Sequence, residues 1–204
     1  MSLLSREQIK ARLNSGKPDQ LFIDPLLSDE QLGAVSIDLR LGCDFLVSVQ
    51  TRKASVSLLK DEFFREPSMF FQESRRDVGE TFILYPSQTA LSTTLEYIGL
   101  PNNVYSDVTT RSSYNRLGLT LNSTFQPGFR GCVSLELFNH SNSPIELVVG
   151  SRIVQARFFG VEEDSQYFTA KQRRKYIGHV RPTTSRAADD SDLAVLSRMA
   201  KEKL

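Results

Sequence analysis

The sequence contains few cysteines and histidines, which limits the sites that the chain can build. Its 204 residues include two cysteines, Cys43 and Cys132, and two histidines, His140 and His179. A zinc site needs several Cys or His ligands at short, regular spacings, and these four residues have no such spacing. Two scattered cysteines are also too few for a disulfide framework. The sequence therefore predicts a protein without bound zinc.

Long apolar runs and an excess of one charge are also missing. No apolar stretch approaches the length that spans a bilayer, and residues 1–10 lack the apolar region of a secretory signal. Lys and Arg number 25 against 24 Asp and Glu, so no overall field attracts nucleic acid or an anionic membrane. We therefore expect a cytoplasmic protein with neither as a partner. Glycine-rich phosphate loops are absent too, so any phosphate site must use local positive charge.

The pattern of apolar residues predicts a mainly β fold. Ser5 and Gln8 have the spacing of a helix-capping box, which places a short helix after Ser5. Between residues 35 and 41, apolar and polar residues alternate, as in a strand with one buried face. Further short strands are expected at 43–49, 81–85, 90–97, 104–109, 117–122, 132–139, 144–148 and 152–159. Many short strands with close turns favour a barrel or sandwich.

Two segments differ from this pattern. Residues 51–78 mix many charges with four phenylalanines, and we expect a surface excursion with some helix there. From residue 166 onward the chain is basic and polar, and residues 187–204 have the pattern of an amphipathic helix. We therefore divide the chain into a β domain at 1–165 and a C-terminal tail at 166–204.

The densest polar cluster occupies residues 109–116 and contains Arg111, Ser112, Ser113 and Arg116. Two arginines and several hydroxyls within one turn supply the hydrogen-bond donors that a triphosphate needs. The same composition is typical of a solvated loop whose Ser and Thr residues cap a helical turn, and composition alone favours that reading. The cluster is therefore only a candidate phosphate site.

A second candidate lies in the expected strand at 132–139. Alternation places Val133, Leu135 and Leu137 on one face and Ser134, Glu136 and Phe138 on the other. A carboxylate among apolar residues can have a raised pKa, which suits a general base near neutral pH. A glutamate on the solvated face of a strand is the commoner case, and the spacing does not decide between the two.

Several segments together resemble the dCTP deaminase branch of the trimeric dUTPase-like superfamily, in the order that this family has them. They are SIDLRLG at 36–42, RSS at 111–113, RLGL at 116–119, PGFRG at 127–131, LELFN at 135–139, GSRIVQ at 150–155, KYIG at 175–178 and TTSR at 183–186. The resemblance implies a distorted β-barrel of the jelly-roll type that assembles as a homotrimer. It also implies active sites between subunits, each closed by the C-terminal tail over the nucleotide.

The resemblance assigns roles to particular residues. It places Glu136 as the general base for the water that attacks cytosine C4, because no metal is available to activate that water. Ser112 and Arg116 would orient the water or substrate and stabilise the developing charge. Phosphate contacts fall on Arg111, Ser113, Gln155 and Lys175, with Mg²⁺ arriving on the triphosphate and no zinc. Asn122 falls at the base or sugar, and the remaining substrate-binding candidates are Gln126, Tyr167, Lys171 and His179.

Three departures from the family pattern affect the expected reaction. Gln126 stands where plain dUTPases have an aspartate that activates water, and a neutral amide cannot act as that base. The segment between Leu119 and Pro127 is shorter than in the best-known deaminases, and His179 stands at a position usually held by glutamine. We therefore expect dCTP deamination to dUTP and ammonia. The alternatives are a dUTP pyrophosphatase and a non-catalytic regulatory trimer that binds deoxynucleotides. The expected partner is a deoxyribonucleoside triphosphate: dCTP first, with dUTP and dTTP as further candidates.

Overall fold

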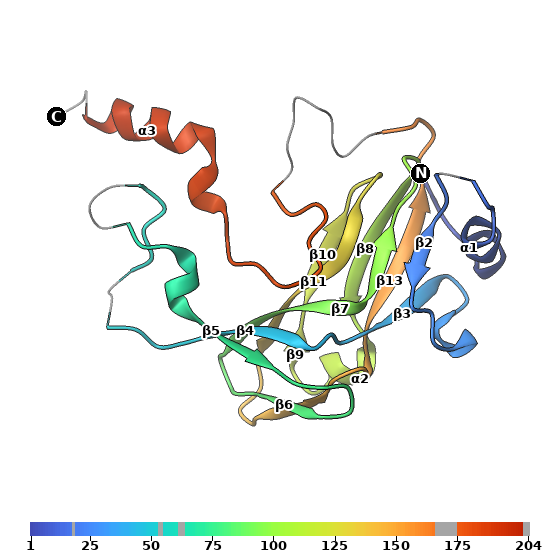
Figure 1. The fold of residues 1–204 in the computed structure, drawn as a ribbon, viewed down its shortest axis with the longest axis horizontal. Helices are drawn as coiled ribbons and strands as arrows, with labels where there is room; N and C mark the ends of the chain where they lie inside the picture. Colours follow the sequence, from blue (N-terminus) through green and yellow to red (C-terminus); the bar gives the residue numbers. More distant parts are fainter. Residues whose placement is uncertain (18, 53–54, 61–63, 166–174, 202–204) are drawn as a thin grey trace.

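The chain folds mainly into antiparallel strands, as predicted (Figure 1). A computed structural model describes residues 1–17, 19–52, 55–60, 64–165 and 175–201. One sheet contains β1 (Ser2–Leu3), β13 (Arg152–Gly160), β8 (Val104–Thr110) and β10 (Asn122–Phe125), with β3 (Ser36–Arg40) beside β13. The other contains β5 (Phe71–Arg75), β4 (Asp44–Ser48), β7 (Thr89–Gly99), β11 (Arg130–Asn139) and β9 (Leu119–Thr120), with β2 (Phe22–Asp24) beside β7. A third, two-stranded sheet pairs β6 (Thr81–Leu84) with β12 (Ile145–Val148).

The core collects the alternate apolar residues of both large sheets. Ile37 and Leu39 of β3 are fully buried, and so are Val133, Leu135 and Leu137 of β11. Burial of apolar surface is the main favourable term in folding, so these strand faces fix how the sheets pack. Register shifts interrupt the pairing of β11 with β7 and of β13 with β3, and such irregularities bend a sheet toward a barrel.

The N-terminal helix forms where the capping box predicted it. Helix α1 (Arg6–Leu13) begins after Ser5, whose backbone N–H donates to Oε1 of Gln8 at 2.9 Å. The side chain of Ser5 accepts in turn from the backbone N–H of Gln8. Leu4 and Ile9 are both buried beneath this turn, so the helix start is anchored to the barrel.

Several predicted boundaries were wrong. The strand expected at 117–122 is instead two short strands, β9 and β10, because the preceding helical turn α2 (Ser112–Asn115) continues to Gly118 at a φ of 92°. In the excursion at 51–78, the helical content that we expected is limited to a 3-10 turn at Pro67–Phe70 among the described residues. The excursion then returns to the sheet as β5, which pairs with β4.

Strand β3 is more buried than its alternating pattern predicted. Ser36 and Asp38 should face solvent, but they are only 4% and 9% exposed. Ser36 lies beneath the turn at Gly33, and Asp38 is paired across the strands with Gln155 of β13 and forms an ion pair with Arg111. The polar face of this strand is therefore covered by other polar groups, which one-strand periodicity cannot reveal.

The C-terminal tail runs along β11 and ends in α3 (Ser191–Lys201), which projects from the barrel at the end opposite α1 (Figure 1). The predicted helix at 187–204 was therefore placed too early, since residues 187–189 form a separate 3-10 turn. Two backbone hydrogen bonds join the tail to β11: Gly178 N–H donates to Arg130 at 2.7 Å, and Cys132 N–H donates to His179 at 2.9 Å. No helix in the described part of the chain is long and apolar enough to cross a membrane.

Candidate active site

Glu136 lies on the wall of a cavity of about 580 Å³. Its side chain is exposed, while its neighbours Leu135 and Leu137 are buried, so the alternation predicted for β11 is confirmed. Phe71, Phe125, Phe129 and Tyr176 supply the aromatic part of the wall, beside a larger number of Ser and Thr residues. The ring centroids of Phe125 and Phe129 are 4.7 Å apart. A carboxylate on the wall of an aromatic cavity is suited to a planar ligand that needs a proton acceptor beside it.

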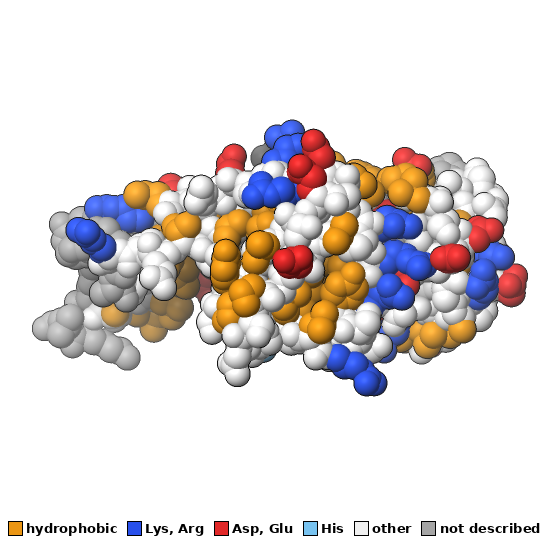
Figure 2. All heavy atoms as spheres, turned by 90° about the horizontal axis from the view of Figure 1, so that it is seen from below, with side chains coloured by type: hydrophobic (Ala, Val, Ile, Leu, Met, Phe, Trp, Pro, Cys, Tyr) orange, Lys and Arg blue, Asp and Glu red, His pale blue; other side chains and the backbone are white. Residues whose placement is uncertain are grey.

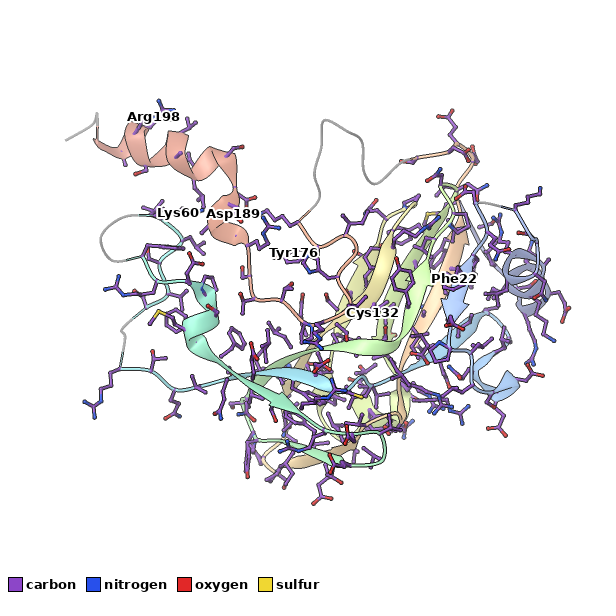
Figure 3. All side chains as sticks on the ribbon, viewed as in Figure 1. Phe22, Lys60, Cys132, Tyr176, Asp189 and Arg198 are labelled. Atoms are coloured by element: carbon purple, nitrogen blue, oxygen red, sulfur yellow. The ribbon has the colours of Figure 1, made fainter. Side chains whose placement is uncertain are left out.

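The tail covers this cavity from the same chain. Tyr176, Pro182, Thr183 and Ser185 line it together with residues of β7 and β11. Figure 3 shows Tyr176 on the tail and Cys132 on the sheet below it. The two backbone hydrogen bonds between the tail and β11 therefore hold this part of the tail at the cavity that Glu136 lines. That the tail closes over a bound nucleotide remains a prediction.

A second cavity, of about 730 Å³, contains the arginine and serine cluster. Arg111, Ser112, Ser113 and Gln155 all line it. Strand pairing brings them together, because Gln155 of β13 lies opposite Asp38 of β3 on one side and opposite Thr109 of β8 on the other. Four of the predicted nucleotide contacts therefore share one surface.

The charge of this second cavity is not favourable for a free triphosphate. Among the residues that the structure describes, Arg111 is the only basic one of this lining, whereas Glu30 and Asp38 are acidic. Nε of Arg111 lies 3.0 Å from Oδ2 of Asp38, so the arginine is already paired. Further positive charge must come from elsewhere if this cavity is to hold phosphates.

The two cavities have no lining residue in common within the described part of the chain. The short segment at 120–124 runs between them, with Thr120 and Leu121 on the second cavity and Ser123 and Thr124 on the first. Within one copy, the structure therefore places Glu136 and the Ser112 cluster on separate surfaces. Arg116 is exposed at the end of α2 and lines neither cavity.

The other predicted site residues are placed as follows. Gln126 lines the first cavity together with Glu136. Lys175 forms a short ion pair with Asp190, and His179 contributes its backbone carbonyl to β11. Asn122 pairs through its backbone with Thr109. Tyr167, Lys171 and the side chain of Asn122 lie outside the described residues.

The sequence did not reveal a buried carboxylate in β7. Glu96 is fully buried, and burial raises its pKa although backbone and Gln31 hydrogen bonds oppose that shift. Gln31 Nε2 donates to Oε1 of Glu96 at 2.9 Å, and the backbone N–H of Arg40 donates to Oε2 at 2.9 Å. A single Glu amid the apolar and hydroxyl residues of β7 was the available signal.

The groups that could hold metal or act as nucleophiles are limited. Among residues the structure describes, no three His, Cys, Asp or Glu side chains gather as possible metal ligands. Desolvation raises the pKa of Cys132 to about 11, so this thiol stays protonated near neutral pH and is a poor nucleophile. The absence of zinc and the role of nucleotide-bound Mg²⁺ remain predictions from the sequence.

Comparisons with known proteins agree with the motifs. A family model described as dCTP deaminase-like matches residues 3–161. A Methanobrevibacter smithii protein named "dCTP deaminase, dUMP-forming" is 34% identical over 198 residues, which cover 95% of this chain and 99% of that protein. A Natronomonas pharaonis protein named "dCTP deaminase" is 33% identical over 195 residues, or 93% of this chain and 97% of the relative.

A solved structure is similar in its fold. The crystal structure of 2'-deoxycytidine 5'-triphosphate deaminase from Agrobacterium tumefaciens matches 77% of this chain with a TM-score of 0.58 and 21% identity. The match spans 48% of that protein, so this chain corresponds to about half of its length. At this identity the likeness bears on the fold alone, and it confirms the barrel that the sequence motifs implied.

Proposed function

Because the chain belongs to the dCTP deaminase-like family, we propose that it hydrolyses dCTP to dUTP and ammonia with Glu136 as the general base. The observation that carries this proposal is the position of Glu136 on the wall of the aromatic cavity under the tail. Cytosine is planar and has an exocyclic amine that must leave as ammonia. A cavity with aromatic walls and one carboxylate suits both requirements.

Glu136 performs the proton transfers in this proposal. Its carboxylate accepts a proton from water as the water oxygen bonds to C4 of the base, which gives a tetrahedral centre. The proton then passes to the departing amine, the C4–N bond breaks, and ammonia leaves. A carboxylate can serve first as base and then as acid in this way, and general acid–base catalysis typically contributes about 10²–10⁴-fold to the rate.

The cluster at 111–116 completes the site from a second copy of the chain. The cavity that holds Glu136 and the cavity that holds Ser112 share no lining residue in one copy, which supports a site built across a subunit boundary. We propose a homotrimer, in which each copy supplies both halves to different sites. Ser112 and Arg116 then orient the water and stabilise the charge on the tetrahedral centre. Apolar side chains that gather on one face of the single copy also favour assembly (Figure 2).

The triphosphate occupies the second cavity in this proposal. Arg111, Ser113 and Gln155 line that cavity and supply donors to phosphate oxygens. Lys175 joins them when the nucleotide competes with Asp190 for its ammonium group. The substrate is the magnesium complex of dCTP, whose metal offsets part of the phosphate charge. The cytoplasm remains the predicted location.

The nature of the product depends on Gln126. This amide lines the same cavity as Glu136 and has no basic oxygen to activate a water molecule against a phosphate. It therefore supports dUTP as the final product. The second candidate is dUMP with pyrophosphate, and it is favoured by the name "dCTP deaminase, dUMP-forming" of the M. smithii relative.

Product analysis with dCTP and Mg²⁺ tests both parts of the proposal. Wild type should release ammonia and accumulate dUTP, with no dUMP or pyrophosphate. Glu136→Gln should lower kcat by about 10³-fold while still binding nucleotide. Glu146→Gln is the matched control, because Glu146 is an exposed strand glutamate on β12 outside both cavities, and it should keep wild-type rates.

The other outcomes separate the alternatives. Equal rates in wild type and Glu136→Gln would remove Glu136 as the base. Formation of dUMP and pyrophosphate would show that another group replaces the missing aspartate. Tight nucleotide binding without ammonia release would favour the regulatory trimer.

A further inference from the structure

Asp38 is a nearly buried carboxylate that the proposed chemistry leaves without a role. Its side chain is 12% exposed, and its Oδ2 atom lies 3.0 Å from Nε of Arg111. Both residues line the second cavity, so the ion pair lies at the proposed triphosphate site. A carboxylate at a phosphate site would repel the substrate unless its charge is used for something else.

The contacts of Arg111 indicate what the negative charge of Asp38 does at this site. Its Nη1 donates to the backbone carbonyl of Arg152 at 3.0 Å, and its Nε forms an ion pair with Oδ2 of Asp38 at 3.0 Å. One hydrogen bond and one ion pair therefore hold two of the three guanidinium nitrogens from the protein side. Within the described part of the chain, Nη2 has no hydrogen-bond partner. A guanidinium is planar, so two contacts of this kind set the direction in which the third nitrogen points.

The backbone of β3 is anchored in the core at Asp38 and at Arg40, two residues later. Gln31 Nε2 donates to the carbonyl of Asp38 at 3.0 Å and to Oε1 of Glu96 at 2.9 Å. Oε2 of Glu96 accepts from the backbone N–H of Arg40 at 2.9 Å. Gln31 and Glu96 are both fully buried. A buried carboxylate therefore fixes the strand from which Asp38 reaches Arg111.

We propose that Asp38 is a positioning residue that aims the free Nη2 of Arg111 at the substrate's phosphates, with Glu96 as the buried anchor of its strand. This inference rests on the proposed function, since it takes Arg111 as a phosphate ligand. Asp38 touches neither the base nor the reacting atoms. It acts on affinity for the triphosphate by keeping one guanidinium orientation ready before the substrate binds.

Asp38→Asn is the direct test, because it removes the charge but keeps the shape of the side chain. The KM for dCTP should rise about tenfold, and the Kd of inorganic tripolyphosphate, measured by calorimetry, should rise by the same factor. The kcat should change by less than about threefold, and inhibition by deoxycytidine, which has no phosphate, should not change. Asp38→Glu should recover part of the lost affinity, because it restores the charge at a slightly different position.

Two controls separate positioning from a general loss of structure. Asp107→Asn breaks a similar ion pair in the same sheet, where Oδ2 of Asp107 lies 3.1 Å from Nη2 of Arg157, outside both cavities. It should leave the Kd of tripolyphosphate unchanged. In an Arg111→Ala background, Asp38→Asn should weaken tripolyphosphate binding no further, since Asp38 acts through Arg111.

The results that would overturn the inference are specific. An unchanged Kd of tripolyphosphate in Asp38→Asn would overturn it. An equal rise of this Kd in Asp107→Asn would also do so. So would a rise of the Kd by Asp38→Asn in the Arg111→Ala background that is as large as in wild type. If Asp38→Asn does not fold, an Arg111→Ala variant that keeps the wild-type Kd of tripolyphosphate would also overturn it. The tripolyphosphate measurement does not need turnover. A wild-type protein that fails to deaminate dCTP would therefore refute the proposed function. The role of Asp38 could still be tested by tripolyphosphate binding.

Discussion

Two glutamates of neighbouring strands have opposite surroundings and correspondingly different roles. Glu136 of β11 is exposed on a cavity wall, where it can meet a ligand. Glu96 of β7 is fully buried, and its oxygens are occupied by Gln31 and by the backbone of Arg40. The first is available for catalysis, whereas the second stabilises the strand that carries Asp38.

Glu96 should make the stability of the protein depend on pH. Its pKa is raised by burial, so the folded protein binds this proton more tightly than the unfolded chain does. The resulting stabilisation is fully present below the ordinary glutamate pKa of about 4.3 and is lost as the pH rises through the raised value. Glu96→Gln removes this titration. Urea unfolding at a series of pH values above about 4.3 should show the free energy of unfolding of the variant rising relative to that of wild type as the pH rises.

Glu146→Gln provides the comparison for this measurement. Glu146 is exposed on β12, so its substitution should leave the pH dependence of unfolding parallel to that of wild type. If Glu96→Gln and wild type lose stability in parallel across the same range, Glu96 is not the group responsible.

Single residues also show what the sequence could and could not predict. The alternation along β11 identified Glu136 and its face, because a strand's period is a local property. Asp38 was expected in solvent, because its cover comes from Gln155 and Arg111, which are more than 70 residues away in the chain. Contacts of this kind depend on the register between strands, and one strand's pattern does not contain that register.

Among the elements, β11 and the tail form the roof of the first cavity. Gly131 of β11 has a φ of 144°, and a Cβ atom at this position would lie 2.8 Å from the carbonyl oxygen of His179. The same carbonyl accepts the hydrogen bond from Cys132. The tail can therefore approach the strand closely only because residue 131 is a glycine.

Gly131→Ala should detach the tail from the sheet. The methyl group clashes with backbone and imposes a strained φ, which together cost about 1–3 kcal/mol. We expect faster proteolysis of the tail and a KM for dCTP that rises about tenfold, since the roof no longer stays closed. Limited proteolysis and steady-state kinetics provide the measurement.

Gly79→Ala is the matched control for backbone strain. Gly79 has a φ of 91°, but a Cβ atom there would have no neighbour within 4 Å. It should lose some stability and retain the KM of wild type. Equal effects of the two substitutions on KM would show that the contact with the tail is not responsible.

Most strands could be predicted from the sequence, and those without alternating apolar residues were missed. The strands at 43–49, 81–85, 104–109, 144–148 and 152–159 were found within a residue or two, because their apolar residues recur mostly at every second position. β5 was missed because its sequence, FQESR, is mostly polar and lies at the edge of the sheet. β10 was misplaced because NSTF resembles a turn in composition.

For the whole molecule, the division of the site between two cavities is the main consequence of the fold. The net charge of +1 gives no general attraction for a nucleotide, and the second cavity contains one basic residue against two acidic ones. Among the described residues of one copy, Glu136 and the Ser112 cluster lie on separate cavities. We propose that Glu136 of one copy lies beside Ser112 and Arg116 of another.

Mixing two inactive variants tests this claim most directly. Glu136→Gln and Arg116→Ala should each lose ammonia release from dCTP as pure proteins. Co-assembled in equal amounts, they should regain activity at about a quarter of the sites, because random assortment pairs an intact Glu136 with an intact Arg116 that often. Mixing each variant with itself is the control. A mixture that stays as inactive as its components would contradict a site shared between copies.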